Sequence, residues 1–78
     1  MVKKSEPLAV IVISNNMALV ITEVNDTEET VSSYFGGDKY AVKSKLRFDD
    51  NGRAYFKRGG AKYYLDEAIR TDVGGRLI

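Results

Sequence analysis

The residues of this 78-residue chain that could do chemistry are its lysines, arginines and tyrosines, because the usual catalytic side chains are missing. The sequence contains no cysteine and no histidine, which removes disulfides, thiolate zinc sites and the commonest general base and metal ligand. The acidic pair Asp49-Asp50 precedes Asn-Gly and is typical of a turn, and Asp66 is placed to cap a helical turn. We therefore expect a protein that is not an enzyme and has no cofactor or metal ion.

Cationic residues are concentrated in the middle of the chain. Residues 1–38 hold six acidic residues and two lysines, whereas residues 39–62 hold eight cations and two acids, so the net charge of +1 hides a dipolar molecule. Cations with tyrosine between them on a sheet suit single-stranded nucleic acid, because phosphates meet the charges and bases stack on the rings. The predicted nucleic-acid-binding residues are Lys39, Lys43, Lys45, Arg47, Arg53, Tyr55, Lys57, Arg58 and Lys62.

Two other interpretations fit the same residues and stay open. Lysine and arginine are common on the solvated face of a sheet and protect edge strands from aggregation. The acidic and basic segments could also meet a protein of opposite charge. The alternative function is therefore a protein-interaction module such as an inhibitor, adaptor or regulatory subunit, for which proteins of mobile elements offer an analogy.

The elements that would carry the cations are predicted strands. From Lys39 to Phe48, apolar and cationic residues alternate, which is typical of a strand with one solvated face. The turn signal Asp49-Asp50-Asn51-Gly52 predicts a return through residues 53–57, and a further strand is predicted over residues 61–65. Arg53, Tyr55 and Lys57 would share the cationic face of the first strand if the register matches.

The first half of the chain predicts a hairpin and one ambiguous segment. Leu8–Ile13 and Met17–Val24 are rich in β-branched residues, and Asn15-Asn16 between them can adopt positive φ in a tight turn. Residues 27–35 fit either a short helix capped by Asp26 or Thr27, or a strand that pairs across Gly36-Gly37. The acidic first turn and the helical spacing of the apolar residues favour the helix.

Together these elements predict one mainly β domain over residues 1–78. We expect a small antiparallel sheet or partly closed barrel, SH3- or OB-like, of about five strands with one or two short helices; the alternative class is α+β. Residues 1–6 are expected to be flexible, and residues 72–78 to form a tail or a short edge strand. The predicted core comprises Val10, Val12, Ile13, Leu19, Ile21, Val31, Phe35, Val42, Leu46, Phe48, Phe56, Leu65 and Ile69.

Location and self-association follow from size and apolar content. No apolar run reaches the roughly 20 residues of a membrane span, and no secretory signal is convincing, so we expect a cytoplasmic protein. A domain this small is only marginally stable alone. The apolar residues Leu77 and Ile78 would be better buried, so we expect a homodimer formed through sheet edges or the tail.

Overall fold

A computed structural model describes residues 6–70 of the chain as a mainly β protein with eight strands and one short 3-10 helix. The elements are β1 (Ala9–Ser14), β2 (Met17–Asn25), β3 (Thr30–Phe35), β4 (Val42–Lys45), β5 (Arg47–Phe48), β6 (Ala54–Arg58), β7 (Ala61–Tyr64), η1 (Leu65–Glu67) and β8 (Ile69–Arg70). The predicted fold class is thereby confirmed. The predicted tail and, apart from Glu6, the predicted flexible N-terminus lie outside the described residues.

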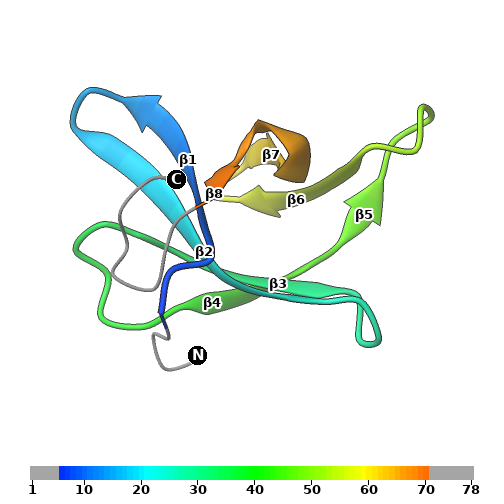
Figure 1. The fold of residues 1–78 in the computed structure, drawn as a ribbon, viewed down its shortest axis with the longest axis horizontal. Coiled ribbons are helices and arrows are strands. Elements are labelled where there is room, and N and C mark those ends of the chain that lie inside the picture. Colours follow the sequence, from blue (N-terminus) through cyan, green and yellow to red (C-terminus); the bar gives the residue numbers. More distant parts are fainter. Residues whose placement is uncertain (1–5, 71–78) are drawn as a thin grey trace.

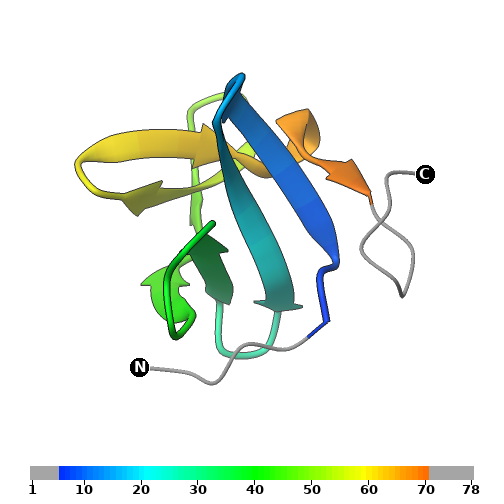
Figure 2. The same ribbon diagram turned by 90° about the vertical axis from the view of Figure 1, so that its left-hand side faces the viewer.

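The strands form two antiparallel sheets that share one core. The larger sheet has the order β4-β3-β2-β1-β8 and the smaller one the order β5-β6-β7. The chain passes from the larger to the smaller sheet at Leu46, so that β6 lies over β3 and β4 (Figure 1). The β6–β7 hairpin crosses the β1–β2 hairpin at a steep angle (Figure 2). This arrangement gives the smaller sheet one face toward the core and one toward solvent.

The core lies between the inner faces of the two sheets. Phe56 of β6 is fully buried and packs with Leu19, Ile21 and Val31 of the larger sheet. A fully buried phenylalanine contributes roughly 1.5–3 kcal/mol relative to an exposed one. Phe56 is therefore the main apolar link between β6 and the larger sheet.

The predicted core includes four exposed residues, and a fifth member, Val10, lies on the face of β1 that points away from the core. In β1 the residues that face the core are Ala9 and Ile11, whereas Val12 is 59% exposed. A strand that is apolar at consecutive positions gives no alternation from which to assign its inner face, so the prediction chose the wrong face. The other exposed members of the predicted core are Ile13, Phe48 and Ile69.

Residues 27–35 do not form the helix that the sequence favours. Thr30–Phe35 is β3, which pairs with β2 on one side and β4 on the other. The segment before it is a turn in which the Asn25 side-chain oxygen accepts a hydrogen bond from the Glu28 backbone N–H, and Glu29 takes a φ of 57°. Pairing on both edges and burial of Val31 outweigh the local helix signals.

The cationic segment and its neighbours also depart from the prediction. The expected strand from Lys39 to Phe48 is divided at Leu46, which is buried, and its first residues belong to a loop. Asp66 makes no capping hydrogen bond to η1, and Ile69–Arg70 forms β8 instead of a helical turn. The Asn15-Asn16 hairpin is present, although neither asparagine has positive φ.

The turn at Asp49–Gly52 is confirmed. Gly52 has a φ of 79°, and an Asp49 side-chain oxygen accepts hydrogen bonds from the backbone N–H groups of Asn51 and Arg53 at 2.9 Å. This turn fixes how β5 and β6 pair. Over residues 6–70, no helix is long and apolar enough to cross a membrane.

Candidate nucleic-acid interface

The outer face of the β5-β6-β7 sheet brings cations and tyrosines together in adjacent cross-strand pairs. Tyr55 of β6 lies opposite Tyr64 of β7, and Lys57 lies opposite Lys62 two residues further along the hairpin. Directly opposed residues in an antiparallel pair project to the same face. This face is named the Tyr–Lys face and comprises Arg47, Arg53, Tyr55, Lys57, Lys62 and Tyr64.

Arg47 joins the Tyr–Lys face through the register of β5. Arg47 lies opposite Tyr55 across the edge of β6 that pairs with β5, whereas Tyr64 lies across the edge that pairs with β7. β6 therefore contributes the central row of the face. The condition placed on the register in the sequence prediction is therefore met for Arg47, Tyr55 and Lys57.

Both tyrosine rings on this face contact a cation. The rings of Tyr55 and Tyr64 are 5.5 Å apart at their centroids. The Arg53 guanidinium lies 4.0 Å from the Tyr64 ring centroid, and the Lys62 ammonium lies 4.7 Å from the Tyr55 centroid. Cations are attracted to the negative face of an aromatic ring, which explains why Arg53 and Lys62 lie over these rings.

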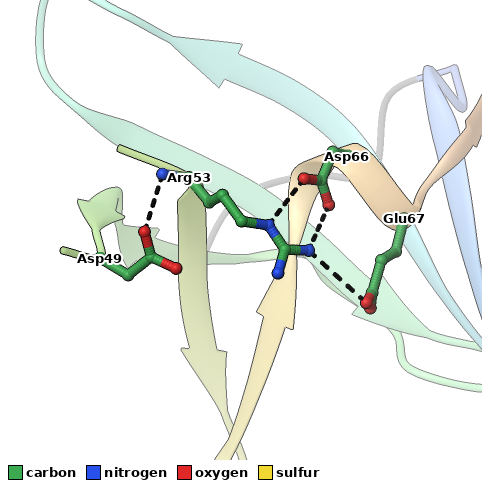
Figure 3. A network of polar contacts seen from close by, with 4 residues as sticks. All are labelled: Asp49, Arg53, Asp66 and Glu67. Carbon is green, nitrogen blue, oxygen red and sulfur yellow. Dashed lines mark hydrogen bonds and ion pairs between the residues drawn. The ribbon is translucent and has the colours of Figure 1, made fainter. Parts of the chain in front are cut away.

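Arg53 is held in place by acidic residues, as Figure 3 shows. Its guanidinium donates two hydrogen bonds of 2.9 Å to the Asp66 carboxylate, and Glu67 lies 3.8 Å away. The hydrogen bond from Arg53 lowers the pKa of Asp66, and the Arg53 backbone N–H lowers the pKa of Asp49. Both carboxylates therefore stay ionised near neutral pH.

The remaining cations of the Tyr–Lys face have no acidic partner among the described residues. Among residues 6–70, Arg47, Lys57 and Lys62 form no ion pair, whereas Arg53 is paired twice. Lys57 and Lys62 are both exposed and directly opposite each other. Like charges in this arrangement are destabilising, and a bound anion would relieve the repulsion.

Arg58, which the sequence assigned to the same surface, lies on the opposite face of β6. Its side chain is only 12% exposed. It donates hydrogen bonds to the Ser33 carbonyl and hydroxyl oxygens at 2.9 and 3.0 Å, lies 3.6 Å from Asp38, and covers the Phe35 ring. With its donors directed into the protein, Arg58 connects β6 to β3 and is a structural residue.

Three further predicted residues lie away from the Tyr–Lys face. Lys43 and Lys45 are exposed on β4 of the larger sheet, and Lys39 is exposed in the loop before it. Lys43 pairs with Glu28 at 3.3 Å. The structure thus brings together five of the nine predicted residues and leaves Lys39, Lys43, Lys45 and Arg58 elsewhere.

Tyr64 is the member of the face that the sequence prediction omitted. Tyr63 and Tyr64 are adjacent in a predicted strand, so only one of them can share a face with Tyr55. Tyr63 packs inward, with its ring centroid 5.9 Å from that of Phe56. An expected pairing of β6 with β7 across Gly59-Gly60 was the signal that could have identified Tyr64.

Two hollows elsewhere on the protein contain none of the predicted residues. An apolar pocket of about 220 Å³ lies beside η1, lined by Leu8, Ile21, Val24 and Leu65 with Arg70. A groove of about 440 Å³ follows the β1–β2 hairpin, where Val12 and Met17 are exposed. Neither presents the clustered positive charge of the Tyr–Lys face.

No protein-family model matches the chain, and no curated protein or solved structure matches it significantly. What this protein can bind is therefore inferred from the geometry and charge of its own surfaces.

Proposed function

We propose that this protein is a non-enzymatic module that binds single-stranded nucleic acid through its Tyr–Lys face, with little sequence preference. Phosphates contact Arg47, Lys57 and Lys62, and the tyrosines contact the bases. Such contacts to the backbone give affinity without sequence readout, and stacking on tyrosine is open to every base. In the cytoplasm, the location expected from the sequence, RNA or single-stranded DNA would be accessible to it.

The observation that carries this proposal is the Lys57–Lys62 pair beside the Tyr55–Tyr64 pair. Opposed lysines weaken the free hairpin by roughly 0.2–1 kcal/mol relative to neutral residues. A surface that only needed to stay solvated would gain by placing a glutamate at one of the two positions. Two ammonium groups with no acidic partner among residues 6–70, next to two aromatic rings, match the phosphates and bases of one strand.

The proposal is tested by a pair of charge-reversal variants with the same net charge. Lys57→Glu/Lys62→Glu changes the Tyr–Lys face, whereas Lys39→Glu/Lys45→Glu changes exposed lysines that lie away from it. Binding to a fluorescently labelled single-stranded oligonucleotide is measured over a salt series. We expect the first variant to lose binding and the second to keep most of it.

Salt dependence separates this function from other kinds of contact. Release of counterions from phosphates makes affinity fall steeply as salt rises. If the wild-type protein does not bind at low salt, or binds with an affinity that is indifferent to salt, the proposal is wrong. Equal losses in both variants would indicate attraction by overall charge and not by this face.

A protein-interaction module is the second candidate, favoured by the outer face of the β1–β2 hairpin. Ile69, Val10 and Val20 lie side by side across β8, β1 and β2 on the face that points away from the core. Val12 and Met17, next to them, are more than half exposed. Exposed apolar patches are typical of interaction sites, and a second copy of this uncharged face is the simplest partner.

Sedimentation separates this second candidate from the first. At tens of micromolar, the homodimer expected from the sequence should be visible as twice the mass of one chain. If the hairpin face forms the contact, Val12→Glu should give a monomer while oligonucleotide binding persists. A dimer unaffected by Val12→Glu would remove this face from the interface.

A further inference from the structure

We infer that the Tyr–Lys face stacks a single base, on Tyr55, while Tyr64 stays covered by Arg53 and does not serve as a second platform. This inference rests on the proposed nucleic-acid function and specifies how one nucleotide is seated. It depends on an asymmetry between the two cations that now cover the rings.

The cation over Tyr64 is fixed. Arg53 is hydrogen-bonded through Nε and Nη2 to both oxygens of Asp66, and Glu67 adds a weaker contact from the same side. Two parallel hydrogen bonds from a planar guanidinium to a carboxylate fix its orientation as well as its position. A base that stacked on Tyr64 would first have to break this pairing.

Within the part of the chain that the structure describes, the cation over Tyr55 is held only by the ring. Among residues 6–70, no carboxylate pairs with Lys62, and its ammonium makes no hydrogen bond with another side chain. The nearby Lys57 repels it. Lys62 therefore leaves the ring more readily than Arg53 does, and Tyr55 becomes available to a base.

Displacement of Lys62 also places its charge where a phosphate needs it. The ammonium moves off the Tyr55 ring toward solvent on the side of Lys57, and the two lysines then flank one backbone phosphate. The base that replaces Lys62 is covered on its other edge by the fixed Arg53–Tyr64 stack. Lys62 thus covers the Tyr55 ring in the free protein and contacts a phosphate in the complex.

Single tryptophan reporters test this inference directly, because the natural chain has no tryptophan. Tyr55→Trp and Tyr64→Trp are each titrated with oligothymidylate and with an abasic deoxyribose-phosphate oligomer of equal length. We expect oligothymidylate to quench the tryptophan at position 55 and leave the one at position 64 unchanged. The abasic oligomer should quench neither.

A loss-of-ring series gives the energetic counterpart. Tyr55→Leu keeps an apolar side chain without an aromatic ring, and Tyr55→Phe keeps the ring. We expect Tyr55→Leu to weaken oligothymidylate binding by about 5- to 150-fold, the range for one stacked base, and Tyr55→Phe to bind nearly as well as the natural chain. Affinity for the abasic oligomer should be unchanged in both.

Releasing Arg53 should open the second ring. In a Tyr64→Trp protein that also carries Asp66→Asn and Glu67→Gln, the guanidinium loses both negative charges and the second acceptor oxygen of Asp66, and we expect oligothymidylate to quench position 64. Circular dichroism and urea unfolding of each variant confirm that the sheet is retained.

The outcomes distinguish this inference from the function on which it rests. Salt-dependent binding of oligothymidylate with equal quenching at both positions, or with none at position 55, overturns the single-platform inference and leaves nucleic-acid binding intact. An affinity for the abasic oligomer equal to that for oligothymidylate also overturns it, since no base would then be stacked. Absence of any binding at low salt overturns both.

Discussion

The two faces of β6 use the same residue types for different purposes. Residues 53, 55 and 57 face outward and residues 54, 56 and 58 face inward, so each side has one arginine and one aromatic ring. Arg53 covers Tyr64 and pairs with Asp66 in solvent, whereas Arg58 covers Phe35 and pairs with Asp38 in a largely buried position. The inner arginine connects two sheets, and the outer one shapes a surface.

This contrast shows that burial, and not residue type, determines what an arginine does here. Arg58 replaces lost water with the Ser33 oxygens, so its removal would leave buried acceptors without donors. Arg53 is bonded to exposed carboxylates that water would otherwise solvate. Exposed ion pairs contribute little to stability, so Arg53 orders the surface around Tyr64 without contributing much to the stability of the fold.

The largest expected difference between the two faces is in their aromatic residues. Phe56→Ala should lower the free energy of unfolding by about 3–5 kcal/mol, because it empties the centre of the core. Tyr55→Ala, one position away on the outer face, should cost much less. Urea unfolding monitored by circular dichroism measures both, and equal losses would contradict the assignment of the two faces.

The arginines should differ in the same direction. Arg58→Met keeps the aliphatic stem but removes the donors to Ser33, and we expect it to lower the free energy of unfolding by about 2–3 kcal/mol. Arg53→Met should shift the urea midpoint only slightly, since its partners are exposed. A larger shift for Arg53→Met than for Arg58→Met would reverse the comparison.

A smaller effect of opposite sign is expected for the opposed lysines. Lys62→Glu replaces repulsion across the β6–β7 hairpin with attraction to Lys57 and should stabilise the free protein by about 0.2–1 kcal/mol. The same substitution should weaken oligonucleotide binding. Lys45→Glu, on the other sheet, provides the control; a destabilised Lys62→Glu protein would show that Lys62 has a structural role.

The smallest effect concerns pH. Arg53 lowers the pKa of Asp66 below its ordinary value of 3.8, so the folded protein binds a proton at this carboxyl less tightly than the unfolded chain does. The stabilisation is therefore complete above that value and is lost as the pH falls through the lower, folded pKa. Asp49 should behave in the same way.

Urea midpoints between neutral pH and about pH 2 measure this loss. Asp66→Asn should lie below the natural chain near neutral pH and approach it at the acidic end. A constant gap between the two proteins would show that Asp66 acts through its shape and not its charge.

Part of this protein was determined by the sequence alone. The lack of cysteine and histidine, the β-branched hairpin and the turn at Asp49–Gly52 depend on residue type and local geometry, so the strand class and the alternation of Arg53, Tyr55 and Lys57 could be predicted. Period-two alternation specifies a face whenever one side of the strand is polar. That condition holds for β6 and explains why the centre of the candidate site was predicted.

The rest was decided by tertiary structure. Residues 30–35 form a strand because β2 and β4 pair with both of its edges. The apolar residues of β1 do not indicate an inner face, so its pairing with β2 decides that Ile11 faces the core. Arg58 carries the same charge as Arg53, and only the position of β3 beneath it makes it a buried connection. The β6–β7 register places Tyr64 opposite Tyr55 and so makes it part of the site. In each case the deciding contact joins segments distant in sequence or depends on strand pairing, and local residue patterns do not encode it.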